Sequence, residues 1–162
     1  MIYDWALQLP LNLIYQKARR FGLDPILVAS IVFQESRGFV YAVRLEPDFK
    51  WTHRVDHFAK YQNTTPETEE NLQKHSFGLM QIMGGTARSI GFDGALPALY
   101  KPENNLFWGC KYLARLKEKY PDEKDMVAAY NAGSPRKTPT GEYVNQRYVD
   151  QVFSRLSGRG DA

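Results

Sequence analysis

One acidic side chain follows an apolar stretch, and its position suggests acid-base chemistry. Residues 27–36 read Leu-Val-Ala-Ser-Ile-Val-Phe-Gln-Glu-Ser. In a helix, Val28, Ile31 and Glu35 share one side, because residues three and four apart are neighbours. If this side faces the core, desolvation raises the pKa of Glu35 and suits it to general acid catalysis near neutral pH. Alternatively, Glu35 lies past the buried part and reaches water, as most charged residues do.

Other polar residues near the ends of expected helices suit a carbohydrate ligand. Ser76, Gln81 and Asn131 supply hydroxyl and amide groups, and the chain has 10 Tyr and 3 Trp. Amides and hydroxyls hydrogen-bond to sugar hydroxyl and N-acetyl groups, while aromatic faces stack on sugar rings. These residue types favour an enzyme that acts on glycans.

Several other chemistries lack their motifs. No Gly-x-Ser-x-Gly elbow of a serine hydrolase occurs, and residues 83–86 (Met-Gly-Gly-Thr) lack the lysine of a phosphate-binding loop. His53 and His57 have a zinc-ligand spacing, but Arg54 stands between them and no third ligand is evident. We therefore expect neither a metal nor a cofactor. Cys110 has no partner for an internal disulfide and falls in an apolar register, which predicts an inert buried thiol.

Composition predicts a single globular domain over residues 1–162. The chain is 43% hydrophobic and 14% aromatic, which argues against disorder. Its net charge of +3 is scattered, so a nucleic-acid partner is not expected. No stretch is long and apolar enough for membrane insertion, and Asp4 and Pro10 do not fit a signal peptide. We expect a monomer.

Hydrophobic spacing and capping residues predict a mainly α fold with at most a small β piece at residues 39–52. Asp24 and Asp122 are expected N-caps, and Thr64 with Glu67 is expected to form a capping box. The helix after that box is polar and is expected to present its charges to solvent. The expected helices span residues 10–21, 24–37, 67–74, 83–91, 102–120, 122–133 and 143–156, and residues 92–101 are expected to form a loop.

Four motifs occur in a characteristic order. They are Gln-Glu-Ser at 34–36, Ser-Phe-Gly-Leu-Met-Gln-Ile at 76–82, Ala-Tyr-Asn-Ala-Gly at 129–133, and Tyr148 in the last expected helix. Each is of limited specificity alone. Together, over residues 23–156, they resemble the soluble lytic transglycosylases, a family with a goose-type lysozyme-like (SLT) helical fold. The resemblance implies one catalytic domain that acts on peptidoglycan glycan strands.

The resemblance also implies roles for single residues. Glu35 corresponds to the catalytic acid and base. Tyr130 and Tyr148 have an alternative reading as ordinary core aromatics. The residues that correspond to substrate-binding positions are Ser36, Ser76, Met80, Gln81, Tyr130, Asn131 and Tyr148.

The implied reaction is non-hydrolytic cleavage of the β-1,4 bond between N-acetylmuramic acid and N-acetylglucosamine. Glu35 protonates the glycosidic oxygen and then removes a proton from the C6 hydroxyl of the muramic acid. That hydroxyl attacks its own anomeric carbon and forms an anhydro-muramyl end. The place of action is the cell wall or periplasm. Since no signal peptide is seen, release by another protein, as for a phage lysin, is one possible route.

The chain departs from the family in an insertion-like segment at residues 45–75. The segment adds carboxylates, and an inverting hydrolase needs a second carboxylate to position water. Glu46 is the candidate for that role, with a salt bridge to Arg44 as its alternative. Two other functions therefore stay open: a hydrolytic muramidase, and a catalytically silent wall-binding or assembly module.

Overall fold

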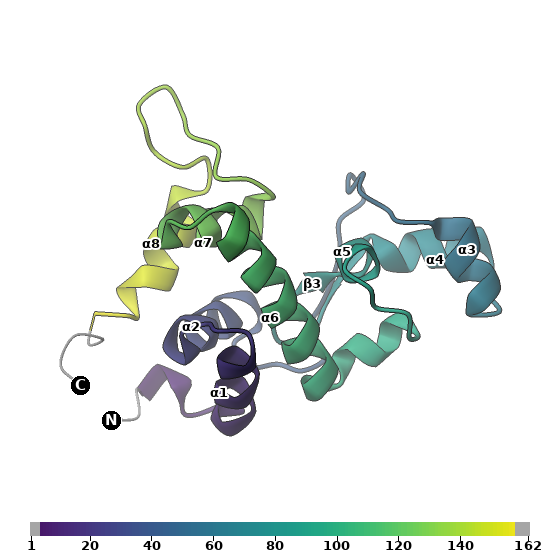
Figure 1. Ribbon diagram of the computed structural model, residues 1–162, viewed down its shortest axis with the longest axis horizontal. Coiled ribbons are helices and arrows are strands. Elements are labelled where there is room, and N and C mark those ends of the chain that lie inside the picture. The colour runs from purple at the N-terminus through teal and green to yellow at the C-terminus, as the bar shows by residue number, and fades with distance from the viewer. Residues whose placement is uncertain (1–3, 158–162) are drawn as a thin grey trace.

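The computed structural model describes residues 4–157 as a set of helices around one long helix, α6, with a small sheet beside it (Figure 1). Helices α1 and α2 lie on one side of α6, α7 and α8 lie near its C-terminal end, and α3 and α4 lie beyond the sheet. The helices are η1 (Asp4–Ala6), α1 (Leu11–Arg20), α2 (Pro25–Ser36), α3 (Val55–Tyr61), α4 (Pro66–Gln73), α5 (Gly84–Ser89), η2 (Leu96–Tyr100), α6 (Pro102–Lys119), α7 (Glu123–Ala132) and α8 (Gln146–Ser154). The mainly α prediction is confirmed.

Local signals at both ends define α2. Asp24 caps its N-terminus, where Oδ1 accepts a hydrogen bond from the backbone N–H of Ile26 at 2.8 Å, and Pro25 occupies the first position. Residues 27–32 are all buried, because α1 and α8 pack against this helix. The helix ends at Ser36, and its C-cap Arg37 has a left-handed φ of 52°. Glu35 therefore lies in the last turn, just past the fully buried residues.

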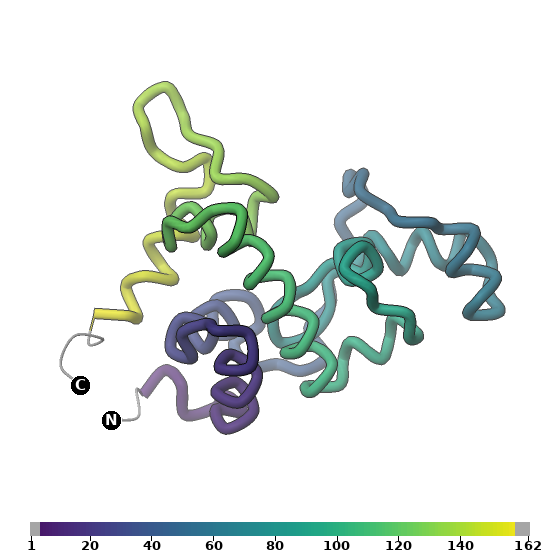
Figure 2. Tube along the Cα trace, in the orientation of Figure 1, coloured from purple at the N-terminus to yellow at the C-terminus, as the bar shows by residue number. Residues whose placement is uncertain are grey.

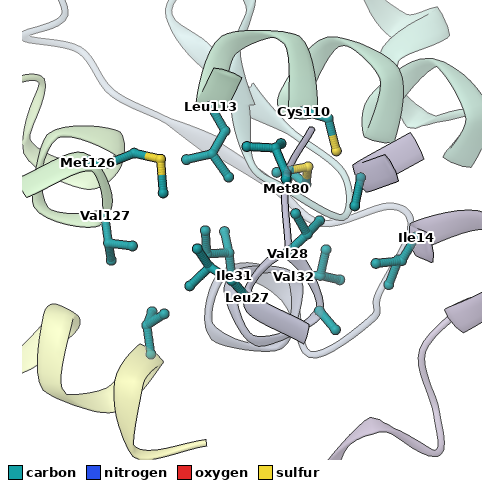
Figure 3. Close-up of a cluster of buried hydrophobic side chains, with 14 of the residues drawn as sticks. Ile14, Leu27, Val28, Ile31, Val32, Met80, Cys110, Leu113, Met126 and Val127 are labelled. Atoms are coloured by element: carbon teal, nitrogen blue, oxygen red, sulfur yellow. The ribbon is translucent and has the colours of Figure 1, made fainter. Parts of the chain in front are cut away.

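The main core joins α2 to the other long helices. Figure 3 shows side chains of α1, α2, α6 and α7 packed around Met80, which lies in the loop at residues 78–81. Cys110 is among these buried residues, and burial raises the pKa of its thiol to about 12. The predicted burial of this thiol is confirmed. The labelled core residues are Ile14, Leu27, Val28, Ile31, Val32, Met80, Cys110, Leu113, Met126 and Val127.

Three short antiparallel strands form the sheet in the order β1 (Val43–Leu45), β2 (His75–Phe77) and β3 (Ile82–Met83). Arg44 lies opposite Ser76, which in turn lies opposite Met83. The predicted β piece is confirmed for β1. The other two strands were not predicted, because they are too short for a period-two pattern and depend on pairing with β1 some thirty residues earlier.

The segment at residues 45–75 folds into α3 and α4, which pack on each other at one end of the molecule (Figure 2). The predicted N-cap of the helix after residue 64 is wrong by one residue. Thr65, and not Thr64, is the N-cap of α4, and its hydroxyl accepts from the Thr68 N–H at 3.2 Å.

The expectation that the charges of α4 face solvent is wrong for one of them. Glu69 is buried and forms a two-point ion pair with buried Arg88 of α5, at 2.8 Å from Nε and 3.1 Å from Nη2. Gln73 donates a third hydrogen bond to Glu69 at 2.9 Å. The pair joins the segment to the sheet-proximal helix α5, and sequence spacing gave no sign of it.

Two other expectations differ in extent from the structure. The last helix begins at Gln146 and not at Tyr143, because the Gln146 side chain accepts from the Tyr143 N–H at 3.0 Å before the helix starts. The expected loop at 92–101 contains η2, whose N-terminal turn includes Pro97.

Candidate active site

Glu35 is partly buried at the end of α2, facing α8. The Tyr148 hydroxyl of α8 donates a hydrogen bond to Glu35 Oε1 at 2.5 Å. Ser30 ties the same two helices one turn earlier, where its hydroxyl donates to the Val152 carbonyl at 2.7 Å. The carboxyl therefore has one oxygen held by a tyrosine that is 113 residues away in sequence.

The surroundings of Glu35 favour its neutral form. Desolvation raises its pKa from 4.5 to about 7, and the hydrogen bond from Tyr148 and the positive charge of Arg44 partly offset that rise. At neutral pH a substantial fraction of the carboxyl is thus protonated. Both the acid and its conjugate base are available, as a group that gives and then takes a proton requires.

Tyr130 of α7 is a second tyrosine whose pKa depends on Glu35. Its hydroxyl donates to the Met80 carbonyl at 2.7 Å, and its ring contacts Tyr112 with a centroid distance of 5.5 Å. Burial, and then the charge of Glu35, raise the pKa of Tyr130 well above its ordinary value. The charge of Glu35 thus raises the pKa of both Tyr130 and Tyr148.

Ser36 links the end of α2 to the loop between β2 and β3. Its hydroxyl donates to the Leu79 carbonyl at 2.8 Å and accepts from the Gly38 N–H at 3.2 Å. These contacts occupy the hydroxyl with the backbone. Ser36 therefore fixes the loop next to Glu35.

The loop between β2 and β3 is held by Ser76 and Gln81. Ser76 donates to Gln81 Oε1 at 2.9 Å, while Gln81 Nε2 donates to the carbonyls of Ala42 and Gly78, each at 3.0 Å. Gln81 also has a left-handed φ of 48°. Both side chains are brought together as the motif order suggests, and their polar groups are engaged within the protein.

The Met80 side chain lies in the core, where it cannot contact a substrate. Its side chain is fully buried and faces Gly109 of α6, where a Cβ would come within 2.4 Å of the Met80 sulfur. Its link to the site is the backbone carbonyl that accepts from Tyr130. The expected contact between the Met80 side chain and a ligand is therefore not supported by its position.

Asn131 follows Tyr130 at the exposed end of α7. Its Oδ1 accepts from Asn145 Nδ2 at 2.9 Å, and the same Asn145 amide donates to the Ala128 carbonyl at 3.1 Å. This pair connects α7 to the segment that precedes α8, while the Asn131 side chain remains accessible to a ligand.

Asn105 of α6 is a site-supporting residue that sequence reasoning missed. It is fully buried; its Oδ1 accepts from Met80 N at 2.7 Å, and its Nδ2 donates to the carbonyls of Phe77 and Leu99. It also lies so close to Gly78 (φ 67°) that a Cβ there would approach Nδ2 to 2.5 Å. The sequence signal that could have indicated this role is the position of Asn105 next to Leu106, which belongs to the apolar stripe of α6.

Glu46 lies just after β1 and is bound to Arg44. Its Oε1 is 2.8 Å from Arg44 Nε. The salt bridge considered as the alternative is therefore present.

In residues 4–157, no three His, Cys, Asp or Glu side chains are grouped to hold a metal ion. His57 instead stacks on Tyr61, and the His53 backbone hydrogen-bonds with Gln73. The groups that act on the Glu35 carboxyl are the Tyr148 hydroxyl and the Arg44 guanidinium.

Comparison with known proteins identifies the family. Residues 12–152 match the Transglycosylase SLT domain family. The chain belongs to this family. The motif at 34–36 and the motifs at 76–82 and 129–133 all fall within the matched region of the SLT domain.

Curated relatives of the SLT domain include longer proteins. A putative soluble lytic murein transglycosylase of Haemophilus influenzae is 40% identical over 88 residues, which cover 51% of this chain and 13% of that protein. Membrane-bound lytic murein transglycosylase C of Actinobacillus pleuropneumoniae is 29% identical over 157 residues, which cover 88% of this chain and 35% of that protein. The transglycosylase of Enterobacteria phage PRD1 is 28% identical over 115 residues, which cover 71% of this chain and 31% of that protein. The chain thus spans about a third or less of each relative.

A solved structure has the same fold. An inactive mutant of lytic transglycosylase Slt from Pseudomonas aeruginosa matches with a TM-score of 0.66 and 20% identity, over 96% of this chain and 24% of that one. The lysozyme-like helical prediction is confirmed at the level of fold. Among residues 4–157, no helix has the length and apolar character needed to cross a membrane.

Proposed function

We propose that this SLT domain cleaves the β-1,4 bond between N-acetylmuramic acid and N-acetylglucosamine in peptidoglycan and leaves anhydro-muramyl ends. The observation that carries the proposal is the partly buried Glu35 carboxyl, whose pKa of about 7 allows it to donate and then accept a proton. Membership of the SLT family and the names of the relatives support the same substrate.

Glu35 acts first as an acid. Because Tyr148 donates to Oε1, the proton of the neutral carboxyl is favoured on Oε2, where a glycosidic oxygen can receive it. The bond between the anomeric carbon and that oxygen breaks as the proton arrives. The departing N-acetylglucosamine leaves with a free C4 hydroxyl.

The same carboxyl then acts as a base. The Glu35 carboxylate, steadied by Tyr148 and by the charge of Arg44, takes the proton of the muramic acid C6 hydroxyl. The C6 oxygen bonds to the anomeric carbon and closes the anhydro ring. Glu35 ends the cycle protonated, so a single carboxyl serves both steps and no metal or cofactor takes part.

The surrounding residues position the carboxyl and the glycan. Tyr148 and Tyr130 lie close enough to Glu35 to feel its charge, and Asn131 is the exposed amide that follows Tyr130 in the chain. Ser36, Ser76 and Gln81 shape the adjacent loop through their internal hydrogen bonds, and Met80 contributes its carbonyl. We place the reaction at the bacterial cell wall, where the glycan strands are the partner.

The test is digestion of purified peptidoglycan followed by mass spectrometry of the soluble products. Anhydro-muramic ends are expected from the wild-type protein, and their loss from Glu35→Gln. Reducing muramic acid ends would instead indicate a muramidase. Wall binding without any release, unchanged by Glu35→Gln, would indicate a silent binding module.

A further inference from the structure

Asn145 is the N-cap residue of α8, but its side chain makes no capping hydrogen bond to that helix. An N-cap asparagine usually accepts a hydrogen bond through Oδ1 from a backbone N–H of the first turn. Here Oδ1 is buried and has no hydrogen-bond partner among the described residues. A buried acceptor without a partner lowers stability, so another contact of the same side chain must offset the loss.

The Asn145 amide is directed toward α7 instead. Its Nδ2 donates to the Ala128 carbonyl at 3.1 Å and to Asn131 Oδ1 at 2.9 Å, so both amide hydrogens are used. A carbonyl oxygen can only accept, so the atom that faces Ala128 must be the donor nitrogen. The orientation of the amide is therefore fixed by α7, and Oδ1 is left where it has no partner.

The backbone of Asn145 leads from this contact to the active site. Its carbonyl accepts from the Tyr148 N–H at 2.9 Å at the start of α8. The Tyr148 hydroxyl in turn donates to Glu35 Oε1 at 2.5 Å. Hydrogen bonds and one tyrosine side chain thus form a continuous connection from the Ala128 carbonyl of α7 to the Glu35 carboxyl of α2.

The middle of α8 is held differently from its first turn. Val149 and Val152 are buried in the main core, whereas Tyr148 lies in the first turn of the helix. A hydrogen bond weakens steeply when its distance or angle changes, while apolar packing is non-directional. Core packing therefore keeps α8 on the molecule, but it does not by itself fix the turn from which the Tyr148 hydroxyl reaches Glu35.

We infer that Asn145 is a positioning residue, whose amide anchors the first turn of α8 to α7 and so sets the hydrogen bond from Tyr148 to Glu35. This inference rests on the proposed function, in which Glu35 is both acid and base. Loss of the two amide donors leaves α8 in place, because Val149 and Val152 remain buried. It loosens the first turn, and the Tyr148 hydroxyl then acts less strongly on the carboxyl.

The experiment measures the pKa of the Glu35 carboxyl by NMR titration of the whole protein, without substrate. Asn145→Ser removes both donors and keeps a hydroxyl that can cap α8. Tyr148→Phe is then introduced into the wild-type protein and into Asn145→Ser. It should raise the pKa of Glu35 in the wild-type background and raise it clearly less in Asn145→Ser. An equal rise in both backgrounds would overturn the inference.

The rate of glycan release gives a second measurement. Asn145→Ser alone should lower kcat about 2- to 10-fold, the factor that corresponds to one net hydrogen bond. The double variant with Tyr148→Phe should be no slower than Tyr148→Phe alone, because Asn145 acts through the tyrosine hydroxyl. Independent, multiplying losses would show that Asn145 acts elsewhere and would overturn the inference.

Two further variants separate the anchor from general effects on α8. Ser154→Ala removes a hydrogen bond to the Gln151 carbonyl that stays within the last turn of the helix, so Tyr148→Phe should act in this background as it does in the wild type. Asn145→Asp keeps the size of the side chain and its ability to cap, but its carboxylate cannot donate. Comparison within one background cancels the effect of the added charge. A rise in Asn145→Asp as large as in the wild type would overturn the inference, and circular dichroism verifies folding.

Failure of this inference and failure of the proposed function give different results. If the wild-type protein releases anhydro ends and Tyr148→Phe shifts the pKa of Glu35 equally in every background, only the role of Asn145 is overturned. If the wild-type protein releases reducing ends alone, or no glycan, the proposed function is overturned. The titration still decides in that case whether Asn145 positions Tyr148.

Discussion

The Tyr148 hydroxyl lies 2.5 Å from Glu35 Oε1, and this contact connects the last helix directly to the carboxyl at the end of α2. It also offsets part of the rise in the Glu35 pKa that desolvation causes, because a donated hydrogen bond stabilises the carboxylate form. The proposed reaction uses both forms of the carboxyl. The balance between burial and this hydrogen bond is therefore the property that we expect mutations to disturb.

Tyr148→Phe removes the donor and keeps the ring. The pKa of Glu35 should rise further, so the alkaline limb of the pH-rate profile should move to higher pH. The second step needs the carboxylate, and a hydrogen bond to a charged group is worth about 1.5–3 kcal/mol, so kcat should fall about 10- to 100-fold. Peptidoglycan release measured across pH 5–9 tests this, and a profile that stays in place would contradict it.

Glu35→Gln should abolish glycan release while leaving the fold intact. General acid-base groups contribute about 10²–10⁴-fold, and here one group acts twice. The amide cannot donate an acid proton to the glycosidic oxygen. Turbidity loss of peptidoglycan suspensions, with circular dichroism as a control for folding, provides the measurement. Retained lysis would show that another residue is the acid.

The raised pKa of Glu35 also predicts how stability changes with pH. Its folded pKa of about 7 lies above the ordinary 4.5, so the stabilising contribution of its bound proton is complete below pH 4.5. The contribution is lost as the pH rises through about 7, and amounts to about 3 kcal/mol. Urea unfolding at pH 4.5 and pH 8 should show this loss in the wild-type protein and not in Glu35→Gln. Equal pH dependence in the two proteins would indicate a solvated Glu35.

Glu69→Gln should destabilise the protein strongly. It leaves the Arg88 guanidinium buried without its carboxylate, and breaking a buried pair costs about 3–5 kcal/mol. Glu70→Gln is the matched control on the same helix, since its surface pair with Lys74 is worth about 0–1 kcal/mol. Thermal unfolding of both variants gives the comparison. Similar melting temperatures would mean that the buried pair does not anchor the segment at residues 45–75.

Asn105→Ala should loosen the loop between β2 and β3. It leaves Met80 N and the carbonyls of Phe77 and Leu99 without their buried partner. An unsatisfied buried polar group costs about 1–3 kcal/mol, so the total loss should be about 3 kcal/mol or more. Activity should fall as well, even at temperatures where the variant is folded. Denaturant unfolding with parallel product assays tests both effects.

Much of the helical framework follows from local sequence. Asp24 and Pro25 begin α2, Asp122 begins α7, and Gly133 ends it with a left-handed φ, all through contacts within a few residues. Such signals depend on neighbours in the chain. They are therefore readable without the tertiary structure, and they place Glu35 at the end of an apolar helix.

The tertiary structure alone decided the environments of the polar side chains. Glu35 could have been solvated, and it is desolvated because α8 packs on α2 and brings Tyr148 to it. Glu69 lies in a polar stretch and is nevertheless buried, because Arg88 of α5 meets it. Burial and electrostatic pairing depend on residues far apart in sequence, so the sequence by itself determined which residues could do the chemistry, and the fold decided their protonation and their partners.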